Sequence, residues 1–252
     1  MARYDFRSHR LFVENPLAQG ATVPLEGTQA NYLVNVLRLK AGASVLVFNG
    51  RDGEWRAELA LIGKKKTALN IVERTREQTA AGDLHYLFSP LKHARLDYMV
   101  QKAVEMGVSR LAPVIMAHTQ AERVNLGRMR ANAIEAAEQC GVLNIPEVAE
   151  PTKFDSLTRG WKPDRLLVFC DEETDVTDPV AALSSARGGG LAGSPPVSVL
   201  IGPEGGFAAE ERAALLKLPN VVRLALGPRI LRADTAAVAA LTLVQAALGD
   251  WR

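Results

Sequence analysis

Cysteine and histidine are scarce in this sequence of 252 residues, which has two cysteines and four histidines. Cys140 and Cys170 lie in separate segments without a CxxC spacing, and the histidines form no HExxH or HxH pattern. Disulfide frameworks and zinc sites need such spacings, so we expect neither of them, and no metal cofactor. We interpret both cysteines as small buried hydrophobic residues.

Long apolar runs are also missing. No segment approaches the roughly 18 uninterrupted apolar residues of a membrane helix, and residues 1–12 lack the apolar core of a signal peptide. These absences predict a cytoplasmic protein with no membrane partner. Hydrophobic residues make up 48% of the chain and charged residues 23%, which are ordinary values for a globular protein.

The net charge is only +2, but it is unevenly distributed. Residues 1–74 hold 11 Lys and Arg against 7 Asp and Glu, a net charge of +4, whereas residues 75–252 carry −2. Cations position a protein on RNA by contacting phosphates, so the first part is the better candidate for RNA binding. Its candidate contacts are Arg7, Arg10, Arg38, Lys40, Lys64, Lys65 and Lys66. For the three consecutive lysines, a hairpin tip kept soluble by its charge is an equally good explanation.

Two patterns of secondary structure follow one another along the chain. Residues 1–74 contain short β-like stretches separated by glycines, with one helical pattern at 32–37. From about residue 84, strands alternate with helices, which is typical of a mostly parallel sheet covered on both faces. The sequence therefore predicts an α/β chain with a small β-barrel at residues 1–74 and a larger domain at residues 84–252. The helices expected in the larger domain cover residues 94–107, 128–140, 208–217 and 234–248.

Three glycines, Gly188, Gly190 and Gly193, have the GxGxxG spacing of dinucleotide-binding loops. That fingerprint requires a strand before it and a helix after it. Here a polar loop precedes the glycines, and two prolines and a strand follow them. We therefore interpret residues 184–196 as a surface loop.

The strongest chemical signal is the segment VLIGPEGGFAAEE at residues 199–211, in which an apolar strand meets a glycine-rich turn and then a helix. Glycines at the carboxyl end of a parallel strand let the backbone approach a ligand closely. A phosphate-binding loop would end in Gly-Lys-Ser/Thr, and Glu204 would repel phosphate. The segment predicts a nucleotide-like pocket whose ligand is uncharged or cationic near Glu204.

A second segment, LALGPRILRADTAAVAAL at residues 224–241, leads from a strand through an arginine-bearing turn into a helix. Alone, either segment is explained equally well as a tight turn. Together, IGPEGG and LGPRILR resemble the paired loops of the knotted SPOUT methyltransferases. More narrowly, nearly the whole chain is similar to the 16S rRNA uridine N3-methyltransferase family. The further matching motifs are RLFV at 10–13, NVLRLKAG at 35–42, DYMVQKAVEMGVSRLAPV at 97–114 and EAAEQCG at 135–141.

The resemblance implies a fold and a set of partners. Its C-terminal domain would be a trefoil-knotted SPOUT methyltransferase domain, an exception to the rule that chains do not thread, and its N-terminal domain a PUA-like RNA-binding β-barrel. It implies S-adenosylmethionine as the cofactor, 16S rRNA or the small ribosomal subunit as the partner, and a homodimer formed by the C-terminal domain. The apolar stripe of the last helix is compatible with a dimer, although burial in its own core explains it as well: Ala237, Leu241, Val244, Ala247 and Leu248.

The resemblance also implies binding residues, position by position. Cofactor contacts fall on Leu200, Gly202, Glu204, Gly205, Leu226, Gly227, Ile230 and Leu231. One carboxylate among Asp171, Glu172 and Glu173 would reach the ribose or the amino-acid end of the cofactor, a solvated loop being the alternative. Arg95 and Lys102 are candidate RNA contacts, a solvated helix face being the alternative.

Three positions depart from the family's pattern. Val142 stands where an arginine usually follows EAAEQCG, Asp234 where glutamate is commoner, and Asn31 where histidine is frequent. Aspartate keeps the carboxylate of glutamate. The missing arginine puts in doubt any polar contact that this segment makes in relatives.

Methylation of uridine N3 requires removal of an imide proton, because the neutral nitrogen has no available lone pair. The protein must then orient two substrates and stabilise negative charge on the base. A guanidinium suits the second task because it stays charged and offers several donors. Arg229 and Arg232 are the candidate catalytic residues. The sequence leaves open whether solvent or a carboxylate accepts the proton.

Two other functions are compatible with the sequence. One is a non-catalytic RNA-binding or ribosome-assembly factor that has the same fold, and the other is a knotted methyltransferase of tRNA or of a 23S rRNA ribose. The intact IGPEGG and LGPRILR loops argue against the first, since a chain without a cofactor would not need both. The N-terminal barrel and the helix at 97–107 favour the small-subunit uridine over the second.

Overall fold

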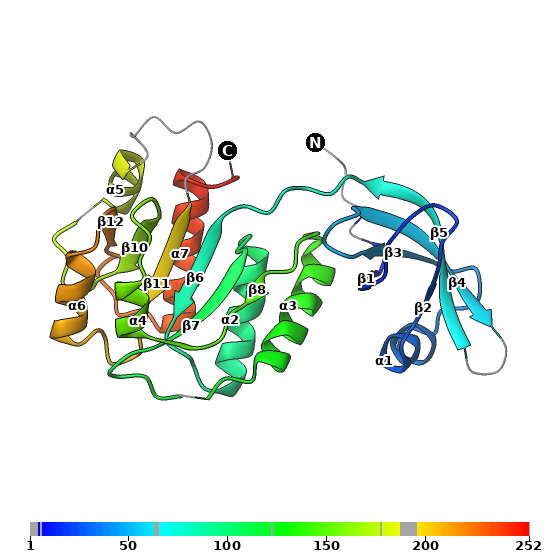
Figure 1. The fold of residues 1–252 in the computed structure, drawn as a ribbon, viewed down its shortest axis with the longest axis horizontal. Coiled ribbons are helices and arrows are strands. Elements are labelled where there is room, and N and C mark those ends of the chain that lie inside the picture. Colours follow the sequence, from blue (N-terminus) through cyan, green and yellow to red (C-terminus); the bar gives the residue numbers. More distant parts are fainter. Residues whose placement is uncertain are drawn as a thin grey trace. The chain divides into compact units, whose positions relative to one another are not determined.

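The computed structural model of the chain forms two compact units (Figure 1). It describes residues 5, 7–62, 66–121, 123–176, 178–186 and 196–251. The N-terminal unit comprises residues 1–80 with 137–145, and the C-terminal unit comprises residues 81–136 with 146–252. Residues 137–145, which the sequence-based ranges assign to the larger domain, thus group with the smaller one. Lys64, Lys65 and residues 187–195 of the predicted surface loop lie outside the described residues, whereas residues 184–186 of that loop belong to a helix.

The N-terminal unit is built on a five-stranded sheet in the order β1-β3-β4-β5-β2. Its strands are β1 (Arg10–Phe12), β2 (Thr22–Pro24), β3 (Ser44–Phe48), β4 (Glu54–Ile62) and β5 (Lys66–Arg76). β1 runs parallel to β3, and the other neighbours are antiparallel. Among the described residues the pairings leave β1 and β2 as the sheet's edges.

The predicted helical pattern at residues 32–37 lies in a longer helical segment. The helix α1 (Gly27–Asn31) continues directly into the π-helical turn η1 (Tyr32–Val36). Leu33 of this turn is fully buried in the core of the N-terminal unit, beside Val45 and Val47 of β3, whereas Val36 is exposed. Leu33 is therefore the fully buried side chain that anchors the segment, since α1 has no buried residue.

The C-terminal unit contains a seven-stranded sheet in which every described strand pair is parallel. The order is β12-β10-β11-β6-β7-β8, and β9 also pairs with β7. The strands are β6 (Leu84–Phe88), β7 (Arg110–Ile115), β8 (Glu147–Val148), β9 (Thr152–Lys153), β10 (Leu166–Cys170), β11 (Val197–Ile201) and β12 (Val221–Leu224). All five residues of β11 are buried, because helices cover both faces of a parallel sheet.

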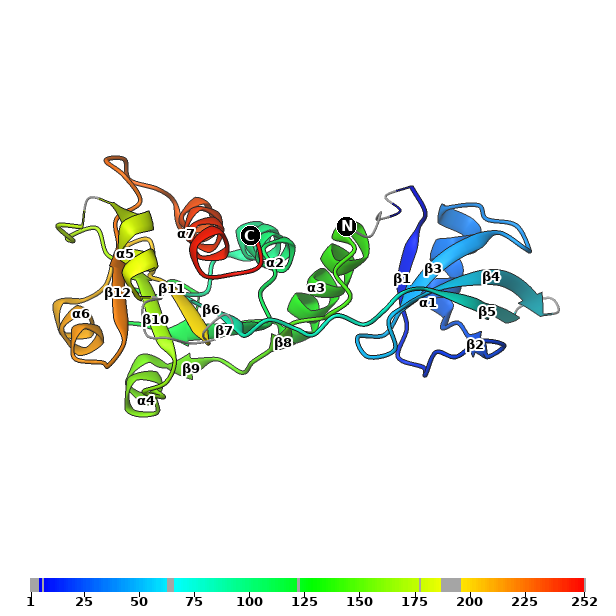
Figure 2. The same cartoon turned by 90° about the horizontal axis from the view of Figure 1, so that it is seen from above.

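Helices form the outer layers of this unit. They are α2 (His93–Glu105), α3 (Leu126–Cys140), α4 (Phe154–Arg159), α5 (Pro179–Ala186), α6 (Ala209–Leu216) and α7 (Ala233–Ala247), α3 ending in the segment that groups with the N-terminal unit. Figure 2 shows α2, α5 and α7 on one face of the sheet and α4 and α6 on the other. The predicted α/β fold class is confirmed, although α4 and α5 were not predicted. Among the described residues, no helix is long and apolar enough to cross a membrane.

Two interpretations of individual residues are wrong. Arg10, a predicted phosphate contact, is buried, and its Nε donates to Glu54 Oε2 at 2.8 Å. Burial alone would raise the pKa of Glu54, but hydrogen bonds from Arg76 and Arg10 hold it below its usual value. Neither Cys140 nor Cys170 is fully buried, since each stands at an element's end where the chain leaves the core.

The apolar stripe of the last helix lies inside the C-terminal unit. Ala237, Leu241, Val244 and Leu248 are each at most 2% exposed, because α7 packs against α2, α5 and β11. Burial in the unit's own core therefore accounts for the stripe, which gives no support to a dimer.

Candidate functional site

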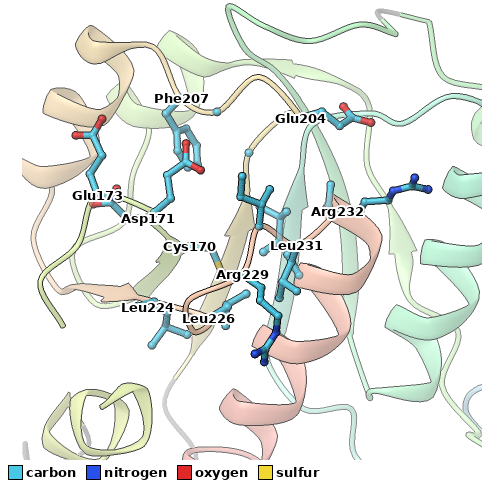
Figure 3. Close-up of a pocket in the computed structure, with 18 of the residues that line it drawn as sticks. Cys170, Asp171, Glu173, Glu204, Phe207, Leu224, Leu226, Arg229, Leu231 and Arg232 are labelled. Carbon is cyan, nitrogen blue, oxygen red and sulfur yellow. Dashed lines mark hydrogen bonds between the residues drawn. The ribbon is translucent and has the colours of Figure 1, made fainter. Parts of the chain in front are cut away.

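A cavity of about 790 Å³ lies at the carboxyl ends of three neighbouring strands of the C-terminal unit (Figure 3). Its walls are residues 170–173 at the end of β10, residues 201–204, 206 and 207 at the end of β11, and residues 224–233 at the end of β12. Because parallel strands end at the same edge of a sheet, the three loops meet there and leave a crevice. The cavity therefore occupies the position where open α/β sheets bind ligands.

Both segments singled out in the sequence border this cavity. Of the predicted cofactor residues, those that line it are Gly202, Glu204, Leu226, Gly227, Ile230 and Leu231. Two predicted residues do not. Leu200 is fully buried in the sheet's core beside Leu87 and Phe169, and Gly205 lies on the outer side of its loop.

The glycines of this site serve different purposes. A Cβ at Gly205 would lie 3.1 Å from Cβ of His118, and one at Gly202 would lie 3.1 Å from the ring of Phe207. Both glycines therefore allow the chain to pack closely on itself. Gly227 differs, because its φ is +88° and a Cβ there would meet nothing within 4 Å. Of these three, only Gly227 leaves open space beside the backbone.

Asp171 is held by two arginines at the cavity's wall. Its carboxylate accepts hydrogen bonds from Nε of Arg212 at 3.0 Å and from Nε of Arg223 at 2.7 Å, and it is 3% exposed. Burial alone would raise the pKa of Asp171, but the two guanidinium groups hold it below its usual value. The predicted role of Asp171 as a cofactor contact thus competes with these ion pairs, whereas Glu172 and Glu173 are exposed at the rim, Glu173 with Arg212 3.4 Å away.

The glycine-rich turn after β11 is attached to the loop after β7. Nδ1 of His118 lies 3.1 Å from the carbonyl oxygen of Gly206. Glu211 of α6 accepts the N–H of Ala117 at 2.8 Å and that of Ala208 at 3.0 Å. Glu204 faces Arg95 of α2 at 3.8 Å. These contacts fix the turn from three directions, so one wall of the cavity is preformed.

The two predicted catalytic arginines both line the cavity and are both exposed. In Figure 3 the side chain of Arg229 lies over α7, while that of Arg232 points in a different direction. No ion pair within the described residues involves either of them. Their guanidinium groups do not converge on one point, so a single reacting atom would meet one of them at a time.

The lining of the cavity is apolar at its base and acidic at its rim. Ile201, Leu224, Leu226 and Leu231 supply apolar surface, and Glu204 supplies a carboxylate. Burial raises the pKa of the Cys170 thiol to about 12, so this group stays protonated and is a poor nucleophile and base. Among the described residues there is no cluster of side chains that could hold a metal ion. The lining suits a ligand with a flat apolar part and a cationic part.

The predicted RNA contacts are distributed over both units. Those in the N-terminal unit that are exposed are Arg7, Arg38, Lys40 and Lys66. In the C-terminal unit, Arg95 is exposed, whereas Lys102 is half-buried and donates to Glu105 at 2.7 Å. Among the described residues of this set, Arg10 is the one that is buried.

Four residues that shape the site escaped the sequence analysis. They are His118, Phe207, Arg212 and Arg223. Arg212 and Arg223 lie 41 and 52 positions away from Asp171 in the chain, and no local pattern indicates such pairings. Phe207 belongs to the motif VLIGPEGGFAAEE, so an aromatic ring next to three glycines was the signal that could have identified it as a residue of the site.

Comparison with known proteins identifies the class. Residues 77–245 match the RNA methyltransferase domain family, so the chain belongs to that family. Residues 25–72 match the RNA methyltransferase PUA domain. The family and the type of enzyme expected from the paired loops are therefore confirmed, as is the PUA-like character of the N-terminal unit.

Particular relatives span almost the full length of the chain. Ribosomal RNA small subunit methyltransferase E of Rickettsia conorii is 28% identical, covering 94% of this chain and 95% of the relative. The protein of the same name from Bacillus subtilis is 27% identical, covering 93% and 95%. A putative methyltransferase of Legionella pneumophila, solved in complex with the bound cofactor SAM, is 27% identical and has a TM-score of 0.81, covering 96% of this chain and 98% of its own.

Proposed function

We propose that the chain transfers a methyl group from S-adenosylmethionine to N3 of a uridine in 16S rRNA, on the small ribosomal subunit. The cavity at the ends of β10, β11 and β12 carries this proposal, because the two segments that resemble the cofactor loops both line it. The names of the curated relatives support a small-subunit rRNA substrate. A ribosomal substrate also favours a cytoplasmic location.

The residues of the cavity fit S-adenosylmethionine. Its volume of about 790 Å³ lies within the usual range of small-molecule sites, roughly 300–1,000 Å³. Leu226 and Leu231 would bury the flat adenine, and the open space at Gly227 lets the backbone approach the ligand. The carboxylates at the rim favour its cationic groups. When bound, the cofactor supplies a methyl group on a positively charged sulfur.

The chain's own residues would orient the base and stabilise its charge. Loss of the N3 proton leaves negative charge on the uracil oxygens, and a preorganised guanidinium lowers the energy of that state. Arg229 is our first candidate for this role and Arg232 the second. Glu204 is committed to Arg95 at 3.8 Å, which leaves solvent as the simplest acceptor of the proton.

We also propose that the protein acts as a homodimer through its C-terminal unit. The observation behind it is that this unit exposes large apolar side chains, one of them at the rim of the cavity. Ile230 is 97% exposed, Trp251 50% and Tyr98 47%. Ile230 lies at the rim of the cavity, so a partner subunit covering it would also shape the site.

The activity is tested with small ribosomal subunits from a strain that lacks the enzyme. Purified protein and S-adenosylmethionine with a labelled methyl group are incubated with these subunits, and the nucleosides are separated by mass spectrometry. N3-methyluridine in 16S rRNA is the expected product. Label in a ribose, in tRNA or in 23S rRNA would support the alternative substrates, and absence of label with retained RNA binding would support a non-catalytic factor.

A further inference from the structure

A second cavity, of about 500 Å³, lies in the C-terminal unit between the beginnings of two helices. Lys92 and Asp97 line it from α2, Thr119 and Arg123 from the loop after β7, and Arg128 from α3. Three cations thus face one carboxylate. No motif in the sequence analysis pointed to this cavity.

The single carboxylate is already neutralised. Asp97 accepts a hydrogen bond from Nε of Arg128 at 2.9 Å and one from Nδ2 of Asn132 at 2.6 Å. Within the part of the chain that the structure describes, no ion pair involves Lys92 or Arg123, and both are exposed. Lys92 and Arg123 are therefore two positive charges without an ion-pair partner among the described residues, beside a guanidinium that Asp97 fixes in place.

The backbone adds to this positive character. α2 begins after Lys92 without a side-chain cap and without an acidic residue in its first turn. The N–H of Arg95 bonds back to the carbonyl oxygen of Lys92, and the N–H groups before it have no capping side chain. The start of α3 differs, because Asn125 Oδ1 accepts the N–H of Arg128 at 3.0 Å. The α2 end thus offers uncapped N–H groups next to Lys92 and Arg123.

This second cavity is the neighbour of the proposed active site. The loop after β7 lies between them: His118 contacts Gly206 at the first cavity, and the adjacent Thr119 lines the second. Thr119 is tied to Ser89 at the end of β6, with 2.9 Å between the hydroxyl oxygens. A strand whose base enters the first cavity would therefore run its backbone past the second.

We propose that the second cavity binds backbone phosphates of the RNA strand that carries the target nucleotide, through Lys92, Arg123 and the beginning of α2. Phosphate contacts of this kind position a nucleic acid without reading its sequence. The identity of the strand as ribosomal RNA rests on the proposed function. The binding of phosphate at this cavity does not depend on it.

The test compares the wild type with the double variant Lys92→Gln and Arg123→Gln. Binding of a single-stranded oligouridylate is measured by fluorescence anisotropy at several salt concentrations. Loss of two single-strand phosphate contacts should lower the slope of log affinity against log salt by roughly 1.4, or about 0.7 for each contact. Affinity at low salt should fall about tenfold, while the affinity for S-adenosylmethionine should not change.

Lys217→Gln is the matched control, because Lys217 is an exposed cation of the same unit at the end of α6 and lines neither cavity. It should bind oligouridylate like the wild type. Equal slopes for the double variant and the wild type would overturn the proposal, as would displacement of the oligomer by uridine monophosphate at equal phosphate concentration. Oligouridylate is not a methylation substrate, so this test does not depend on the proposed function. If the proposed function fails, the wild type will bind the oligomer but will not methylate small ribosomal subunits.

Discussion

Asp171 and Arg223 form a 2.7 Å ion pair between the ends of β10 and β12, and the wall of the larger cavity depends on it. The two strands are direct neighbours in the sheet, and Arg212 of α6 reaches the same carboxylate. One buried carboxylate thus joins two strands and a helix at the place where the loops diverge. The pair links the stability of the fold to the shape of the site.

Removing the charge of Asp171 should lower both the stability of the fold and the affinity of the site for its ligand. Asp171→Asn leaves Arg212 with only Glu173 and Arg223 with only Asp175, each an exposed carboxylate 3.4 Å away, and we expect a loss of about 2–4 kcal/mol in the free energy of unfolding. The affinity for S-adenosylmethionine should fall as well, because the loop after β10 loses its anchor. Urea unfolding and calorimetry measure the two effects. Unchanged stability would mean that the arginines find other partners.

The stability difference between wild type and Asp171→Asn should depend on pH. The folded protein holds the pKa of Asp171 below its usual value, so the ionised carboxylate stabilises the fold above the unfolded-state pKa of about 3.9. That contribution is lost as the pH falls through the lower, folded-state pKa. The difference should be constant from pH 7 to 5 and should shrink below about pH 4. A difference that persists undiminished at pH 3 would contradict this assignment.

Arg229 should affect the chemical step more than the fold. Because no ion pair within the described residues involves Arg229, Arg229→Ala should leave the melting temperature within about 2 °C of the wild type. Removing a preorganised donor typically lowers turnover about a hundredfold to a thousandfold. Arg229→Lys keeps the charge but loses the planar fork, so it should be impaired too.

Single-turnover methylation, cofactor affinity and thermal melting separate the possibilities for Arg229. Arg232→Ala is the natural comparison, since its side chain points elsewhere in the same cavity. Near-normal turnover of Arg229→Ala, with a strong defect in Arg232→Ala, would transfer the catalytic role to Arg232. A collapsed melting temperature would instead assign Arg229 to the fold.

The regular parts of the fold were predictable because local patterns encode them. The apolar run of β11 and the glycines that follow it mark a buried parallel strand that ends at a ligand crevice. α4 and α5 span only 6 and 8 residues, too few for a helical period to stand out from chance. The cavity between α2 and α3 was missed for another reason, since its cations come from three segments.

Residue roles were less predictable than elements, because a role depends on which distant side chain stands opposite. Arg10 and Lys40 look alike in sequence, yet Arg10 faces Glu54 of β4 inside the sheet and Lys40 is exposed. Gly205 resembled a ligand contact, but the position of its missing side chain is closed by His118, which lies 87 residues earlier. The motifs located the site, and only three-dimensional contacts assigned its members.

The proposed dimer should depend on Tyr98 and Trp251, two exposed apolar residues of the C-terminal unit. Tyr98→Asp combined with Trp251→Asp places charge on that surface, and light scattering should then show the mass of one chain instead of two at micromolar concentration. Val180→Asp is the control for a charge added outside that surface, because Val180 is 51% exposed on α5, whereas Tyr98 lies on α2 and Trp251 follows α7. It should leave the dimer intact. A wild type that is monomeric and fully active would reject the proposal.

Arg10 should matter for stability and not for RNA affinity. Arg10→Gln leaves the buried carboxylate of Glu54 with only part of its hydrogen bonds, and we expect a loss of about 3–5 kcal/mol in the free energy of unfolding. Arg56→Gln is the matched control on β4, the strand that carries Glu54, because its pair with Glu73 is exposed and should contribute less than about 1 kcal/mol.

RNA affinity, unlike stability, should depend on Lys40 and not on Arg10. Lys40→Gln removes an exposed cation, so the slope of log affinity against log salt should fall by nearly one unit for a single contact with duplex RNA, while stability changes by less than about 0.5 kcal/mol. Arg10→Gln should keep the wild-type slope at temperatures where it remains folded. If Arg10→Gln lowers the slope as Lys40→Gln does, the ion pair with Glu54 must open on RNA, and the removal of Arg10 from the accessible cations would be wrong.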